Sequence, residues 1–94
     1  MSDRFVPVAA GWWVSNFGGV VLTGIVAARS RRPAMRALFA SAVALHIGEA
    51  VYAYRSARAA GFTHSAPRWA LQTLAVGFPS LLALRDACST AAVQ

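Results

Sequence analysis

Two ionisable residues, His46 and Glu49, lie three positions apart inside the apolar stretch Leu45–Tyr54. Residues with this spacing share one face of an α-helix, so the imidazole and the carboxylate would face the same neighbour. Such a pair could fix helix register through hydrogen bonds, contact a partner, carry a proton or supply two ligands to a metal. Because ionisable groups are costly at membrane depth, the surrounding elements must shield and orient this pair.

Further polar side chains are expected at the same depth. Tyr52 continues the face of His46 and Glu49, and a rise of ~1.5 Å per residue puts Glu49 about 9 Å from the charged end of its helix. Gln72 would lie about 6 Å inside the next helix, so an antiparallel neighbour would bring it level with Glu49. Asn16 of an earlier helix is a further candidate member of this cluster.

Three interpretations of the polar cluster remain open. Its members could be internal hydrogen-bonding partners, which contribute roughly 0.6–2 kcal/mol each between membrane helices. His46 and Glu49 could instead contact a partner protein or a lipid headgroup, or they could carry a proton, bind a metal or catalyse. Metal binding is disfavoured, because the pair supplies only two ligands and the apolar stretches hold no further Cys, Asp or His.

Motifs typical of catalysis are not recognisable in the chain. The sequence has no Ser–His–Asp set, no phosphate-binding loop and no dinucleotide fingerprint. We therefore predict no catalytic residue, no cofactor site and no metal site. The single cysteine, Cys88, also excludes an internal disulfide.

The composition of the 94 residues is typical of a membrane protein. Apolar residues make up 57% and charged residues 13%, whereas globular proteins have about 25% charged residues. The net charge is +6, but the arginines separate apolar runs and form no basic face, which argues against nucleic acid as a partner. Heavy use of Ala, Arg, Gly and Val suggests a bacterial genome of high GC content, so we expect a multi-pass protein of the bacterial inner (plasma) membrane.

Three apolar stretches predict an all-α membrane protein with three transmembrane helices in a single domain, residues 1–94. The expected spans are residues 5–28, 34–56 and 68–84, and about 20 residues suffice to cross a hydrocarbon core of ~30 Å. Pro79 removes one helical hydrogen bond inside the third span, which is therefore expected to kink near it. The arginine-rich loop 29–36 favours an outside amino terminus and an inside carboxyl terminus.

Two stripes of small residues, one on each of the first two spans, recur at every fourth position. Small side chains let helix backbones approach closely in a membrane, so these stripes are predicted to pack against each other. Their members are Gly11, Ser15 and Gly19 on the first span, and Ala40, Ala44 and Gly48 on the second.

The region from His46 to Leu82 resembles the transmembrane protein 254 family, whose members are small three-span membrane proteins without an assigned reaction. This region is 37 of the 94 residues, and the first 40 residues are similar only in being hydrophobic. Polar residues recur at matching places within the apolar runs. The matching residues are His46, Gly48, Glu49, Ala50, Tyr52, Ala53, Gly61, Trp69, Leu71, Gln72, Thr73, Gly77, Ser80 and Leu81.

Within this resemblance, the chain is similar to small accessory membrane subunits of bacterial mammalian-cell-entry lipid transporters. The resemblance implies a subunit that packs against permease helices, with other integral membrane subunits and lipids as its partners. It implies a non-catalytic accessory role and no enzymatic activity. The alternative is a free-standing lipid- or sterol-binding protein, or a homo-oligomeric carrier, that uses Glu49 and His46 directly.

Overall fold

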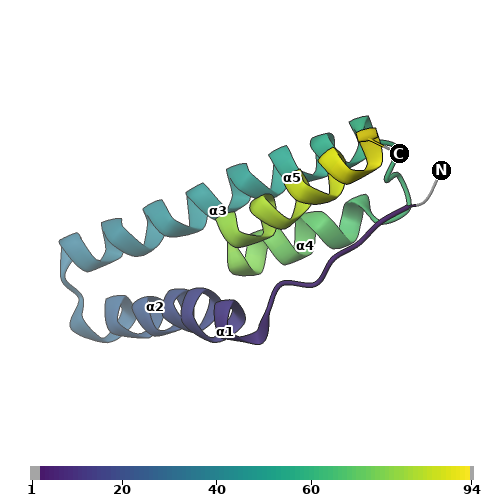
Figure 1. Cartoon of the computed structure of the whole chain (residues 1–94). Coiled ribbons are helices and arrows are strands. Elements are labelled where there is room, and N and C mark those ends of the chain that lie inside the picture. Colours follow the sequence, from purple (N-terminus) through teal and green to yellow (C-terminus); the bar gives the residue numbers. More distant parts are fainter. Residues whose placement is uncertain (1–2, 94) are drawn as a thin grey trace.

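The computed structural model describes residues 3–93, and these residues are helical apart from short connections and an extended start. The first three elements form one continuous rod, α3 runs back beside it, and α4 and α5 form a hairpin against the second half of α3 (Figure 1). The prediction of an all-α fold is confirmed. The elements are α1 (Ala10–Trp12), a π-helical turn η1 (Trp13–Phe17), α2 (Gly18–Ser30), α3 (Pro33–Ala59), α4 (Ala66–Val76) and α5 (Phe78–Val93).

The first helix begins at Ala10, five residues later than predicted, because residues 3–9 are extended. Pro7 lies within this segment and disfavours a helical conformation at the residue before it, Val6. The backbone groups of the two neighbours of Pro7 are bonded to the side chain of Gln72 instead. Long-range hydrogen bonds therefore replace the first helical turn that the sequence predicted.

Two helical stretches of the described chain are long and apolar enough to cross a membrane. They are Ala10–Ser30, with 21 residues, and Pro33–Ala59, with 27 residues. The turn between them is short: Arg31 adopts a left-handed conformation with φ 57°. Pro33 occupies the first turn of α3, where no backbone donor is required.

One face of α3 is covered by the rest of the chain, and the opposite face is open. Covered positions recur every three or four residues, which is the period of an α-helix. His46 and Glu49 belong to this covered face. The buried and half-buried residues of the face are Met35, Phe39, Ala42, Val43, His46, Glu49, Ala50, Ala53, Ser56 and Ala57.

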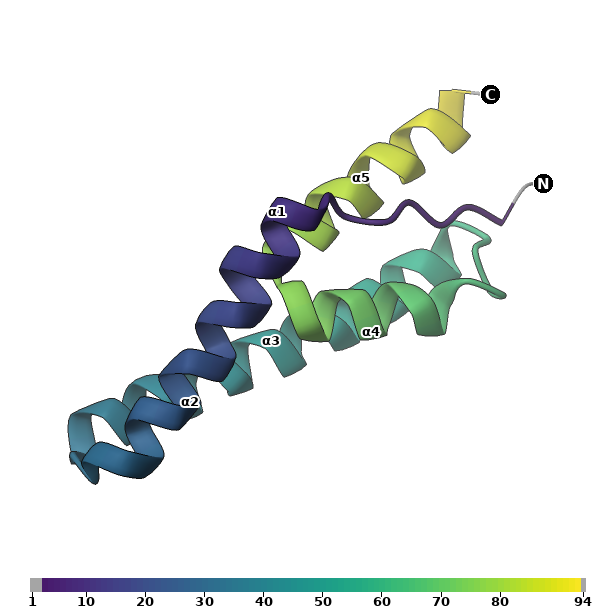
Figure 2. The same cartoon turned by 90° about the horizontal axis from the view of Figure 1, so that it is seen from below.

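The predicted third span, residues 68–84, is two helices and not one kinked helix. Gly77 separates α4 from α5 and has φ 83° and ψ −141°, which no helical residue adopts. At this glycine the chain reverses, so that α5 runs back beside α4 in Figure 1 and is seen in Figure 2 to diverge from α4 towards its own carboxyl end. A kink at Pro79 would have preserved the helix direction, whereas the conformation of Gly77 reverses it.

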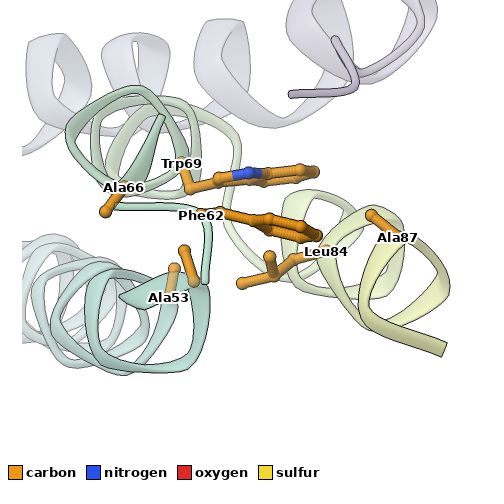
Figure 3. Packing of buried hydrophobic residues seen from close by; sticks show 7 residues of the cluster. Ala53, Phe62, Ala66, Trp69, Leu84 and Ala87 are labelled. Atoms are coloured by element: carbon orange, nitrogen blue, oxygen red, sulfur yellow. The ribbon is translucent and has the colours of Figure 1, made fainter. Parts of the chain in front are cut away.

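The apolar core lies between the second half of α3, α4 and α5. Trp69 and Phe62 are its largest fully buried side chains, and Phe62 lies between Trp69 and Leu84 (Figure 3). Leu84 and Ala87 of α5 share this core with Ala66 at the start of α4, an arrangement that requires the reversal of the chain. Burial of each large apolar side chain contributes about 1.5–3 kcal/mol.

Candidate functional site

The junction between α4 and α5 is centred on Gly77, which is buried. Its positive φ belongs to a region that side-chain-bearing residues rarely adopt. A Cβ atom at this position would lie 3.0 Å from Nε2 of His46 and 3.5 Å from Oε1 of Glu49. The two ionisable side chains of α3 therefore face the point where the chain reverses, and both backbone conformation and space require glycine there.

His46 supplies a hydrogen bond that the interrupted helix α4 lacks. Its Nδ1 lies 2.8 Å from the carbonyl oxygen of Leu74. Because a carbonyl oxygen only accepts, Nδ1 carries a proton in this bond, and the other ring nitrogen, Nε2, lies beside Gly77. The last carbonyls of a helix have no partner within it. An unsatisfied carbonyl in hydrocarbon costs several kcal/mol, so this cap stabilises the break.

Asn16, in η1, caps the same end of α4 from another helix. Its Nδ2 donates to the carbonyl oxygen of Val76 over 2.8 Å. The N–H of Gly77 donates to the carbonyl oxygen of Thr73 over 2.7 Å. Asn16 thus lies close to the depth predicted for it, but it binds backbone and not another member of the polar cluster. Together with His46, it ties the end of α4 to two other helices.

Glu49 and Tyr52 have different surroundings from those of His46. Glu49 is half-buried and, within the described part of the chain, makes no hydrogen bond or ion pair. Tyr52 is 64% exposed and borders a groove between α3 and α5, so its predicted place in the cluster is wrong. Each step of three residues turns the helix face by about 60°, and two steps carry Tyr52 about 120° away from His46.

Gln72 is 4% exposed, and its partners are the extended start of the chain and Ser80, so it does not share hydrogen bonds with the predicted polar cluster of His46 and Glu49. Its Nε2 donates to the carbonyl oxygen of Val6 at 3.2 Å and to Oγ of Ser80 at 3.1 Å. Its Oε1 accepts from the N–H of Val8 at 2.8 Å. A side-chain amide has two donor hydrogens and one acceptor oxygen, so Gln72 can bind both kinds of group along an extended backbone.

Two more residues of α4 and its cap hold residues 3–9, which we call the strap. The indole N–H of Trp69 donates to the carbonyl oxygen of Arg4 over 2.8 Å. The N–H of Ser65 donates to the carboxylate of Asp3, and its hydroxyl lies within hydrogen-bonding distance of both Asp3 and Arg4. The hydrogen bond from that hydroxyl is the main cause that holds the pKa of Asp3 below its ordinary value.

The docking of the strap on α4 was not predicted from the sequence, although the spacing of three polar side chains indicates a polar partner for that face of the helix. Ser65, Trp69 and Gln72 are spaced by four and three positions, so they lie on one face of α4. Such a polar row within an apolar helix requires a polar partner. The sequence does not say that this partner is the extended backbone of the same chain, because the contacts join residues more than 60 positions apart.

The predicted packing of the two small-residue stripes against each other is wrong. No member of either stripe is buried. Helices α2 and α3 instead approach at Gly24, where a Cβ atom would lie 2.8 Å from Cε1 of Phe39. The spacing of small residues shows that they share a face but not which neighbour that face meets. Space is open around the glycines of the stripes, Gly11, Gly19 and Gly48.

The chemistry open to this junction is limited. Among the residues that the structure describes, no group of three His, Cys, Asp or Glu side chains could hold a metal ion. One imidazole nitrogen is used by the backbone of α4, so Nε2 of His46 and the carboxyl group of Glu49 are the polar groups that remain beside Gly77. What the geometry of the junction shows is the support of the broken end of α4 by His46 and Asn16.

The fold and this junction define a class: a small all-α membrane protein in which long apolar helices support a helical hairpin. Residues 2–86 match the family described as transmembrane protein 254. This match covers most of the chain, including the first helix, so the protein belongs to that family. No curated protein and no solved structure matches the chain.

Proposed function

We propose that the protein is a non-catalytic accessory subunit of a larger membrane complex that handles lipids, and that it packs against permease helices of that complex. The observation that carries this proposal is an open row of small residues along α3. The family match and the resemblance to accessory subunits of mammalian-cell-entry lipid transporters agree with it. Localisation in a bacterial inner membrane, as a multi-pass protein, is part of the same proposal.

The outward face of α3 bears a row of exposed small residues, which we call the α3 seam. The covered face of the same helix, with His46 and Glu49, is turned towards the rest of the chain. In a membrane, small residues let a second helix approach closely, whereas apolar side chains alone give little drive for association. A foreign helix would therefore find its closest contact here. The seam consists of Ala37, Ala40, Ser41, Ala44 and Gly48.

Charges at the two ends of α3 support its placement across the bilayer. Arg36 and Arg55 are 19 positions apart, which corresponds to about 28 Å of helix and matches a core of ~30 Å. His46 would then lie near the midplane. Helix α4 has 11 residues, or about 16 Å, and is too short to cross. We therefore place the α4–α5 hairpin as a re-entrant element, in place of the third crossing helix.

The use of polar groups within the fold also supports a non-catalytic role. His46 and Asn16 cap the end of α4, and Gln72 holds the strap. Backbone that is not helical is tolerated at membrane depth only where protein satisfies its polar groups. These side chains form the hydrogen bonds that the non-helical backbone needs. Their presence in an apolar chain therefore has a structural explanation.

Co-purification from native membranes tests the proposal. We expect the tagged full-length protein to elute from mild detergent with a stoichiometric permease subunit. Gly48→Leu or Ala44→Leu should remove that partner, because a large side chain on the α3 seam keeps the second helix away. Ala28→Leu, the same kind of change at an exposed site on α2, is the matched control. A wild-type protein that elutes alone, or a Gly48→Leu protein that keeps its partner, would contradict the proposal.

A free-standing lipid or sterol binder, or a homo-oligomeric carrier, is the second candidate. It is favoured by the carboxylate of Glu49, which has no partner in the described chain and faces Gly77. Co-purification followed by Glu49→Gln tests this candidate. It requires a wild type that elutes without a permease but with a bound lipid, and a folded Glu49→Gln protein that has lost this lipid. A Glu49→Gln protein that keeps the lipid, or a wild type that elutes with a permease, would contradict it.

A further inference from the structure

Helices α3 and α4 border a groove of about 440 Å³, which we call the α3–α4 groove. Its floor is made by two half-buried alanines, Ala50 and Ala70. Arg55 lines it as its only charged residue, and no lining residue comes from α5 or from the strap. The groove therefore meets the junction at Gly77 only at its inner end, through Leu74. Its exposed apolar walls are Ile47, Val51, Tyr54 and Leu74.

The length of the groove fits one leaflet of a bilayer. From Ile47 to Arg55 there are eight positions, or about 12 Å of helix, whereas half of a hydrocarbon core is ~15 Å. Leu74 marks the inner end, at the level of His46, to which its carbonyl is bonded. A partner helix would need a groove along the whole crossing. A groove that ends near the midplane fits an acyl chain instead.

The positive charge of Arg55 at the outer end of the groove favours a lipid with an anionic headgroup. Within the described chain, Arg55 forms no ion pair with an acidic residue. Arg58 lies one turn further on, with its guanidinium 5.7 Å from the centre of the Tyr54 ring. It also donates to the hydroxyl of Tyr54 over 3.4 Å. Two cationic side chains therefore lie at the outer end of the groove. Arg58 contacts Tyr54 in the groove wall, and the guanidinium of Arg55 is left to bind an anion.

We propose that the α3–α4 groove binds one acyl chain of an anionic phospholipid whose phosphate is held by Arg55, with Arg58 beside it. The apolar groove accounts for the chain, and the unpaired cation accounts for the headgroup. This site goes beyond the accessory role proposed above and does not depend on it, because none of its lining residues belongs to the α3 seam.

Native mass spectrometry of the delipidated full-length protein tests this site. The protein is incubated with equal amounts of phosphatidylglycerol and phosphatidylcholine that carry the same acyl chains. We expect the wild type to retain phosphatidylglycerol in preference to phosphatidylcholine. Arg55→Gln should lower that preference about fivefold, the effect of one basic residue at an anionic membrane surface. Arg36→Gln, at the opposite end of α3, is the matched control and should retain the preference.

A second pair of variants tests the apolar half of the site. Ala70→Leu and Ala50→Leu fill the floor and should lower retention of both lipids, whereas Ala28→Leu should not. Circular dichroism identifies any alanine variant that does not fold. In that case the lipid preference of Arg55→Gln, a change at an exposed position, decides whether the proposal stands. Equal retention of the two lipids by the wild type would overturn the proposal. So would an equal effect of Arg36→Gln and Arg55→Gln, which would indicate general surface charge.

Discussion

Nδ1 of His46 donates to the carbonyl oxygen of Leu74 over 2.8 Å, and this bond joins the middle of α3 to the broken end of α4. The imidazole therefore supplies the carbonyl of Leu74 with the hydrogen bond that the next turn of a continuous helix would have provided. Its second nitrogen faces Gly77, where the chain reverses. The ionisable residue that appeared most suited to chemistry is thus part of the support for the hairpin.

Replacement of His46 by Ala should destabilise the protein by about 1–3 kcal/mol, because it leaves the carbonyl of Leu74 without its donor. Thermal unfolding in detergent measures this loss. Leu45→Ala is the matched control, since Leu45 is 64% exposed and removes no hydrogen bond. His46→Asn, which keeps a donor close to the ring position, should recover part of the stability. Equal effects of the His46 and Leu45 changes would contradict the capping role.

Replacement of Gly77 by Ala should cost about 1–3 kcal/mol, because a side-chain-bearing residue is strained at this φ. The new Cβ would also press on the His46 ring. Gly11→Ala is the control: it has open space around it and lies in a helix, where Ala is favoured by about 0.5–1 kcal/mol.

The double variant His46→Ala, Gly77→Ala separates the two causes at Gly77. If contact with the ring contributes, the double variant should lose less stability than the sum of the single variants. Unfolding midpoints of all three proteins supply the comparison. Strict additivity would leave backbone strain as the only cause.

Replacement of Gln72 by Leu should release the middle of the strap from α4. The change removes the bonds to Val6 and Val8, and each bond contributes about 0.5–1.5 kcal/mol. Hydrogen exchange at the N–H of Val8 should become about fivefold faster or more, since one bond of ~1 kcal/mol corresponds to that factor. Leu71→Ala, at an exposed neighbour, should leave this exchange unchanged.

Docking of the outer end of the strap should depend on pH through Asp3. Its hydrogen bonds with Ser65 favour the ionised carboxylate, so its pKa in the folded protein lies below the ordinary value of 3.8. The contribution to stability is therefore complete above 3.8 and is lost as the pH falls through the lowered pKa. The amide chemical shift of Ser65 should report this titration by NMR. Asp3→Asn should abolish it, and a midpoint at or above 3.8 would contradict the assignment.

Properties that depend on local periodicity could be predicted from the sequence. The all-α fold and the first two long apolar helices follow from the runs without charge and from their length. The shared face of His46 and Glu49 follows from their spacing of three, and the covered face of α3 contains both residues. Family membership was also predicted, from polar residues at matching places, and it is confirmed over residues 2–86.

Other features depend on which segments meet, and local pattern does not contain that information. Pro79 marked the place of an interruption, but the φ of Gly77 decides that the chain reverses there. The reversal brings Ser80 of α5 within hydrogen-bonding distance of Gln72, whose other partners lie in the strap. Likewise, the spacing of Ala44 and Gly48 places them on one face, but contacts elsewhere leave that face open.

The sequence alone determined that the chain is all-helical, where its two long apolar helices lie and which side chains of one helix share a face, but not where the first helix begins or that α5 continues beyond residue 84 to Val93. Only the tertiary structure decided that the third apolar run folds back, that residues 3–9 lie along α4, and that His46 caps a helix end. The physical reason is one of range. Helical period and hydropathy act between residues a few positions apart, whereas the partners of Gln72, His46 and Asn16 lie between 28 and 66 positions away in the chain, apart from Ser80.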